Sequence, residues 1–293
     1  MPVTRREFLS AMAVGQAVSP VPRPAPQLCI FSKHLPELNY EQLGKTSREL
    51  GFEGVDLTVR AKGHVLPERA AEDLPRAAEA IRAQGVAVPM ITTELLSAAN
   101  PTARPIISIA GRLKIPYLKP GYYRWGKDDP EKRLAEVGRD LQSLVELGKE
   151  YNVQIGFHNH SGDYVGMAIW DTREIIRDLD PRWVGYYFDP GHSVVEGGST
   201  GWQVALKLVA PRLKMVAVKD FYWAKQDGRW RVRWCPLGEG MVDWPRVFAA
   251  FAAARFAGPM SLHVEYDPKD ELAAIAQDLA FIKKQVKAAY GVG

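Results

Sequence analysis

The sequence predicts an α/β protein built as a single (β/α)8 TIM barrel. After residue 26, short apolar runs alternate with longer stretches of helical periodicity, as expected for consecutive βα units around a parallel sheet. The chain of 293 residues is long enough for eight such units. No low-complexity segment or linker interrupts the sequence after residue 27, so we expect one barrel domain over residues 28–293.

Eight segments are predicted to be the strands. Each is a short run rich in apolar residues, and turn-forming or polar residues flank it. In chain order they are Leu28–Ser32, Gly54–Thr58, Ala87–Thr92, Tyr117–Lys119, Gln154–His158, Val184–Asp189, Met215–Asp220 and Pro259–Glu265.

Helical signals lie between these strands. One helix is expected to open after Asn39 and to end at Gly51, because asparagine favours the start and glycine the end of a helix. Another opens after Asp73, accepts a proline in its first turn and ends at Gly85. The predicted helices are Tyr40–Leu50, Leu74–Gln84, Pro130–Tyr151, Trp244–Ala253 and Leu272–Ala289.

The longest connection follows the seventh predicted strand. It contains Trp223, Trp230, Trp234 and the run Gly238-Glu239-Gly240. A long loop in a compact domain is usually functional, and in a barrel it lies on the active-site face. The glycine run lacks the GxGxxG form and the following Lys or Ser of a phosphate-binding loop, so it is a weak signal.

The composition is ordinary for a globular enzyme. Apolar residues make up 46% and charged residues 25%, which argues against disorder, a collagen-like repeat or a coiled coil. The formal net charge is +4 with no Lys/Arg run, so we expect no nucleic acid and no anionic membrane as partner. Cys29 and Cys235 could pair but are expected to be buried free thiols. The oligomeric state is left open, and a homo-oligomer is compatible with the sequence.

Residues 1–27 resemble an export signal. The basic pair Arg5-Arg6 precedes a mild apolar stretch, Ala11–Val18, and a Pro/Ala segment. The pattern resembles a twin-arginine signal, so we expect a periplasmic or exported protein. The apolar stretch is shorter than the ~20 residues of a membrane span, so no membrane span is expected. The alternative is a frayed N-terminal tail on a cytoplasmic protein.

Polar residues recur at the C-terminal ends of the predicted strands. These ends meet at the mouth of a barrel, whatever their separation in sequence. The residues are Lys33, His34, Asp56, Arg60, His64, Glu94, Lys119, His158, Asn159, His160, Asp189, His192, Lys219, Asp220, His263 and Glu265. His158 and His160 are expected to share one strand face, as are His263 and Glu265. Imidazole with carboxylate, and no thiolate, suits Mn, Co, Zn or Fe.

Several of these residues have a structural alternative. His158 or His160 could be a hydrogen-bonded histidine at the barrel mouth, and Asp189 could cap the following helix. Glu265 could form an ion pair with Lys219. Lys119 and Lys219 could each contact substrate or serve as a structural partner.

Five segments together resemble the xylose-isomerase-like TIM barrels, a superfamily of sugar isomerases, epimerases, inosose dehydratases and apurinic-site endonucleases. They lie on the fifth to eighth predicted strands and on one following loop. The segments are His158-Asn159-His160-Ser161, Asp189-Pro190-Gly191-His192, Val218-Lys219-Asp220, Pro236-Leu237-Gly238-Glu239-Gly240 and Val264-Glu265-Tyr266.

The resemblance implies a divalent metal ion held by His158, Asp189 and Glu265. Two departures stand out. His158 replaces the usual acidic residue, as in the inosose-dehydratase-like branch, and Ala217 replaces a histidine on the seventh strand. Water, His160 or His192 could fill that vacancy, or the metal could be weakly bound or absent.

The resemblance also implies a metal-dependent isomerase, epimerase or dehydratase (lyase) acting on a sugar or cyclitol. Glu265, or Glu94, would move a proton at the carbon next to a carbonyl, with His192 or Lys219 as acid. Glu94, Lys119, His160 and Trp223 are expected to contact substrate. The alternatives are an exported, non-catalytic carbohydrate-binding protein and a metal-assisted hydrolase. DNA repair is not expected, because the richer His/Asp set and the basic groove of the endonucleases are missing.

Overall fold

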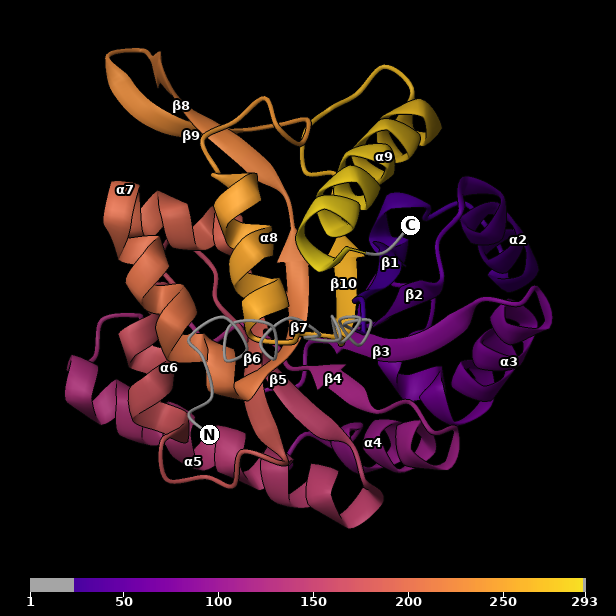
Figure 1. The fold of residues 1–293 in the computed structure, drawn as a ribbon. Helices are drawn as coiled ribbons and strands as arrows, with labels where there is room; N and C mark the ends of the chain where they lie inside the picture. Colours follow the sequence, from indigo (N-terminus) through magenta and orange to yellow (C-terminus); the bar gives the residue numbers. More distant parts are fainter. Residues whose placement is uncertain (1–23, 292–293) are drawn as a thin grey trace, which may run out of the picture.

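Eight parallel strands close into a barrel in the computed structural model, which describes residues 24–291 (Figure 1). Around the ring the strands follow the order β1-β10-β7-β6-β5-β4-β3-β2. Their bounds are β1 Gln27–Phe31, β2 Gly54–Val59, β3 Ala87–Thr93, β4 Tyr117–Lys119, β5 Gln154–His158, β6 Val184–Phe188, β7 Leu213–Val218 and β10 Pro259–Leu262. The predicted (β/α)8 barrel is confirmed.

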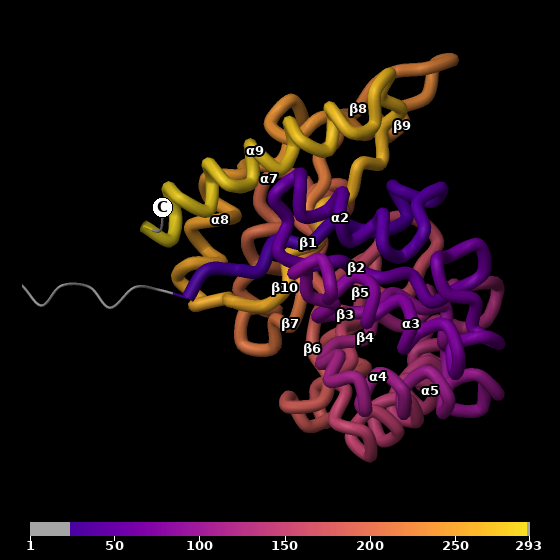
Figure 2. Tube along the Cα trace, turned by 90° about the vertical axis from the view of Figure 1, so that its right-hand side faces the viewer, coloured from indigo at the N-terminus to yellow at the C-terminus, as the bar shows by residue number. Residues whose placement is uncertain are grey.

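Helices follow the strands and surround the barrel (Figures 1 and 2). Their bounds are α2 Tyr40–Leu50, α3 Ala70–Ala83, α4 Ala103–Arg112, α5 Pro130–Tyr151, α6 Ile169–Ile176, α7 Pro190–Val209, α8 Trp244–Ala253 and α9 Glu271–Tyr290. Three short 3-10 segments, Ser32–His34, Pro67–Arg69 and Ala210–Arg212, complete the connections. Three of these helices, α4, α6 and α7, were not predicted.

Local capping explains why α2 begins and ends where it was predicted to. The Asn39 side chain accepts a hydrogen bond from the backbone of Gln42, and the Gln42 side chain accepts one from the backbone of Asn39. Gly51 ends the helix with a positive φ of 90°. Helix α3 begins one turn before the predicted Leu74, because Ala70 is also buried and extends the apolar face.

The long connection after β7 is a β-hairpin rather than the expected loop. Strand β8 (Asp220–Gln226) pairs antiparallel with β9 (Arg229–Cys235). Asp227 and Gly228 join them with positive φ angles of 49° and 74°, which fit the type I′ turn that Asp-Gly favours. The hairpin projects from the end of the barrel at which β7 stops (Figure 2).

Other expectations concern cysteines, membranes and the N-terminus. Cys29 and Cys235 are both buried and unpaired, as predicted. Within residues 24–291, no helix combines the length and the apolar character that crossing a bilayer requires. The predicted export signal lies almost entirely outside the described residues.

Candidate functional site

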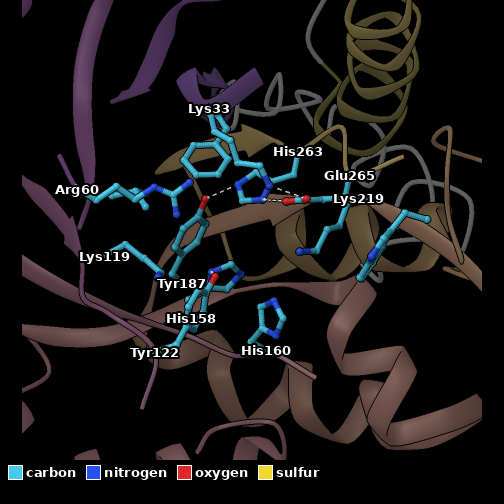
Figure 3. Close-up of a pocket in the computed structure, with 13 residues that line it drawn as sticks. Lys33, Arg60, Lys119, Tyr122, His158, His160, Tyr187, Lys219, His263 and Glu265 are labelled. Atoms are coloured by element: carbon cyan, nitrogen blue, oxygen red, sulfur yellow. Dashed lines mark hydrogen bonds and ion pairs between the residues drawn. The ribbon is translucent and has the colours of Figure 1, made fainter. Parts of the chain in front are cut away.

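A cavity of about 180 Å³ opens at the C-terminal ends of the barrel strands (Figure 3). This is smaller than the ~300–1,000 Å³ typical of pockets for drug-sized ligands, so it suits a compact molecule. The lining residues are Phe31, Lys33, Arg60, Thr92, Lys119, Tyr122, His158, His160, Tyr187, Lys219, Trp234, His263 and Glu265.

Asp189 is the central buried carboxylate. Its Oδ2 lies 3.2 Å from Nζ of Lys219 and 3.3 Å from Nε2 of His158. Its Oδ1 accepts a hydrogen bond of 3.0 Å from the backbone of His192 and so caps α7. Burial alone would raise the pKa of Asp189, but the Lys219 ammonium group, together with His192 and His158, outweighs burial and holds this pKa well below its usual range. Asp189 therefore serves both as a helix cap and as a site residue.

Neutral imidazoles surround this carboxylate. Burial lowers the pKa of His158 to about 3 and that of His160 to about 4. His158 lies between Asp189 and Tyr122, whose hydroxyl is 2.9 Å from Nδ1. Because one ring nitrogen faces a carboxylate, the other is free to accept from the Tyr122 hydroxyl. At neutral pH these histidines are hydrogen-bond partners without charge.

Glu265 is the one carboxylate among the lining residues. Its Oε2 is 2.6 Å from Nζ of Lys33, and its Oε1 is 3.8 Å from Nδ1 of His263. Burial would raise the pKa of Glu265, but Lys219 and then Lys33 oppose it, and the net effect is a lowered pKa. Glu265 is thus ionised at neutral pH. Its ion-pair partner is Lys33 rather than the suggested Lys219, which pairs with Asp189.

Asp56 anchors the barrel interior beneath the cavity. Its carboxylate accepts hydrogen bonds from Thr92 (2.7 Å), Ser261 (2.9 Å) and Tyr187 (3.1 Å), which come from three other strands. Tyr187 also lies 3.0 Å from Nε2 of His263. Burial raises the pKa of Asp56 to about 6. This network fixes the orientation of Tyr187 and His263 at the floor of the cavity.

A family model described as the xylose isomerase-like TIM barrel matches residues 45–285. The chain belongs to this family.

Individual proteins similar to this chain include one curated relative and two solved structures. The inosose dehydratase of Bacillus anthracis is 27% identical over 154 residues, which are 47% of this chain and 49% of that protein. This chain therefore spans about half the length of the curated relatives it matches. The xylose isomerase domain protein from Planctomyces limnophilus superimposes with a TM-score of 0.72 at 17% identity, covering 92% of this chain and 100% of that one. An L-ribulose 3-epimerase superimposes with a TM-score of 0.70 at 16% identity, covering 90% of this chain and 95% of that one. These likenesses show a shared fold.

Most of the predicted site residues meet at the mouth of this xylose isomerase-like barrel. His158, His160, Lys119, Lys219 and Glu265 line the cavity. Asp189 lies directly behind Lys219. Their separate roles in binding or catalysis remain predictions.

Besides Asp189, three predicted site residues do not line the cavity. Glu94 is exposed, and its carboxylate accepts from the backbone of Ala61 at 3.3 Å. His192 is fully buried behind the wall, with Nδ1 2.8 Å from the Ser161 hydroxyl. Trp223 is on the projecting hairpin, and Trp234 of the paired strand lines the cavity instead. This arrangement gives no support to substrate contact by these three residues.

Several lining residues were not predicted as members of the site. Lys33, Arg60 and His263 stand at strand ends but carried no assigned role. Tyr187 precedes Asp189 by two residues, so strand alternation places both on one face and could have indicated it.

The predicted metal ligands do not form a metal site in this arrangement. Among residues 24–291, no group of three or more His, Cys, Asp or Glu side chains is placed to hold one ion. Ala217 supplies no donor atom. The ammonium group of Lys219 contacts the Asp189 oxygen that an ion would need, and Lys33 contacts Glu265. Each of these two carboxylates, Asp189 and Glu265, is therefore already paired with a lysine ammonium group of the protein itself.

Proposed function

We propose that this chain is an enzyme that moves a proton at the carbon next to a carbonyl of a sugar or cyclitol, as an isomerase, epimerase or dehydratase. The observation that carries the proposal is the presence of an ionised carboxylate, Glu265, and a buried ammonium group, Lys219, on one compact cavity. Family membership and the similarity to an inosose dehydratase support this substrate class.

Glu265 would act as the base. Its carboxylate is ionised at neutral pH and faces the cavity. Lys33, which pairs with Glu265, has an exposed side chain and can move away when substrate enters. The freed oxygen could then accept the proton from the substrate carbon.

Lys219 would stabilise the charge that develops on the substrate oxygen. When the carbon loses its proton, negative charge moves to the carbonyl oxygen and an enediolate forms. An oriented ammonium group in a water-poor site is suited to donate a hydrogen bond to that oxygen. Asp189, itself held by His158, keeps Lys219 oriented. Isomerisation, epimerisation and dehydration all share this first step.

Dependence on a divalent metal ion is a separate prediction from the family resemblance. The fit of the residues argues against it here, because lysines contact both carboxylates of the expected ligand set. The steps above therefore use only groups of the chain itself. Metal content measured on the purified protein decides the question.

The proposal is tested by deuterium exchange. The protein is incubated in D2O with a panel of ketoses, aldoses, inososes and sugar acids, and deuterium at carbon is followed by NMR and mass spectrometry. We expect exchange with at least one compound and its loss in Glu265→Gln, whereas Glu94→Gln, outside the cavity, retains it. Ligand binding without any exchange would contradict the proposal and favour a carbohydrate-binding protein.

We also propose that the protein is exported, on the basis of the twin-arginine-like pattern in residues 1–27. Cell fractionation of the full chain beside Arg5→Lys/Arg6→Lys tests this. If the wild-type chain and the variant are both retained in the cytoplasm to the same extent, export is contradicted.

A further inference from the structure

Positive charge dominates the lining of the cavity. Four cationic side chains face it, and Glu265 is the only carboxylate among the described lining residues; the four are Lys33, Arg60, Lys119 and Lys219. Two of these cations are matched: Lys33 by Glu265 at 2.6 Å, and Lys219 by Asp189 at 3.2 Å. Within residues 24–291, no carboxylate lies within 4.0 Å of either Arg60 or Lys119.

Burying the charged form of Lys119 without a carboxylate partner costs free energy. Its side chain is only 2% exposed, and its ammonium nitrogen lies over the face of Tyr122, 3.3 Å from the ring centroid. A ring face offsets only part of the cost of removing a cation from water. Asp56 and Glu94 act on Lys119 only from a distance, and Asp56 is already occupied by three hydroxyl donors.

Arg60 adds a second cation beside Lys119. Its guanidinium group lies over the ring of Phe31 at 5.6 Å, and the described residues provide its side chain with no hydrogen-bond acceptor. The planar edge of the guanidinium group is therefore available for two parallel hydrogen bonds. Arg60 and Lys119 are close enough for their repulsion to lower the pKa of Lys119, second only to burial. Two cations that line one cavity without a counter-ion from the described residues within 4.0 Å would favour an anionic ligand.

The two ends of the cavity differ in kind. Figure 3 shows Arg60 and Lys119 on one side, and Lys219 and Glu265 on the other. A ligand that spans the cavity would place one end against the unmatched cations and the other against the proposed base and hydrogen-bond donor.

We propose that the substrate is an acidic sugar or cyclitol derivative whose anionic group binds between Arg60 and Lys119, with its reacting carbon facing Glu265 and Lys219. This inference rests on the proposed function for the reacting end only. A carboxylate is favoured over a phosphate, because the cavity is compact and a carboxylate is the smaller of the two anions that a guanidinium fork can bind.

The test is calorimetric titration with three probes of one carbon skeleton: D-glucose, D-glucuronate and D-glucose 6-phosphate. We expect glucuronate to bind at least ten times more tightly than glucose, and more tightly than the phosphate. Arg60→Met and Lys119→Met should each weaken glucuronate binding at least tenfold and weaken glucose binding much less. Lys62→Met is the matched control, because Lys62 is exposed and does not line the cavity; it should bind glucuronate as the wild type does.

The outcomes separate the two proposals. Equal affinity for glucose and glucuronate, or no effect of both cavity variants, would overturn the anion site. Preference for the phosphate would keep the anion site but replace carboxylate by phosphate. Binding needs no turnover, so glucuronate binding without deuterium exchange would overturn the proposed function alone. Arg60→Lys, which keeps the charge without the planar fork, should bind with intermediate affinity and guards against a variant that fails to fold.

Discussion

Lys219 places its ammonium nitrogen 3.2 Å from Oδ2 of Asp189, and both side chains are almost completely removed from solvent. A buried carboxylate and a buried ammonium group each depend on the other, since either one alone would be an unpaired charge removed from water. The same pair lies where the family resemblance predicts a metal ligand.

Metal content should be low. With Lys219 at the carboxylate that an ion would use, we expect well under one divalent ion per chain and no loss of exchange activity on chelation. Mass spectrometry of the metals and an assay with EDTA check this. Near-stoichiometric Mn, Co, Zn or Fe that is lost in both Asp189→Ala and Glu265→Ala would instead show that the lysines move aside for a metal.

Breaking the buried pair should destabilise the protein. Asp189→Asn leaves the Lys219 ammonium group without its counter-ion, and we expect a loss of about 3–5 kcal/mol in the free energy of unfolding. Urea denaturation measures it. The double variant Asp189→Asn/Lys219→Met removes both charges and should recover much of that stability. If the double variant is as unstable as the sum of the singles, the charges are not coupled.

Stability should depend on pH through buried histidines. Burial lowers the pKa of His34 from 6.5 to about 4. Between these two values the unfolded chain binds the proton and the folded chain does not, so stability is lost as pH falls from about 6.5 to about 4. Asp56 acts in the opposite direction, because its raised pKa makes the folded state take up a proton first below about pH 6.

A matched variant separates these opposing effects. The difference in unfolding free energy between wild type and His34→Gln should change by up to about 1.4 kcal/mol per pH unit in this window. Urea titrations at pH 4 to 8 measure it. A difference that is constant with pH would show that His34 titrates normally in the fold.

Binding of an acidic ligand should weaken in alkaline solution. Burial lowers the pKa of Lys119 to about 7, with Arg60 and Lys219 lowering it further and Asp56 and Glu94 opposing them. An anion beside Lys119 favours its charged form, so above about pH 7 binding must be accompanied by proton uptake. We expect glucuronate affinity to fall up to tenfold per pH unit above 7 in the wild type. In Lys119→Met this dependence should disappear, as calorimetry in buffers of different ionisation heat would show.

The two strands of the hairpin should contribute unequally to ligand binding. Trp234 lines the cavity, with the ammonium nitrogen of Lys219 4.8 Å from its ring, whereas Trp223 is outside. We expect Trp234→Ala to raise the KM at least severalfold and Trp223→Ala to change it little. Steady-state kinetics on the substrate found by exchange measure this. Equal effects of both substitutions would indicate that the hairpin acts as a whole.

The sequence predicts strands and helices well where local signals are strong. The bounds of β4, β5, α2, α5 and α8 agree with the predictions, because caps, glycines or a proline mark their ends. The hairpin was missed although Asp227-Gly228 between aromatic-rich runs favours one. Its strands carry charged and aromatic residues on exposed faces, so the buried apolar pattern that identifies barrel strands is absent there.

The residues of the site were easier to predict than their partners. Strand ends indicate which side chains reach the barrel mouth, and this placed His158, Lys119 and Glu265 correctly at the cavity. Which charges pair depends on side-chain reach across the closed ring. Glu265 therefore pairs with Lys33 from the first unit, and local sequence contains no signal for a partner so far away.

That pair has a consequence for the order in which the protein becomes active. Lys33 and Glu265 are 232 residues apart and belong to the first and last units of the ring, which meet where β1 pairs with β10. A nascent or truncated chain ending after β7 would contain Lys219 and Asp189 but neither His263 nor Glu265. Such a chain would have most of the cavity lining but would lack Trp234, His263 and the proposed base, Glu265. The proposed chemistry therefore requires the C-terminal unit to have docked against the first strand.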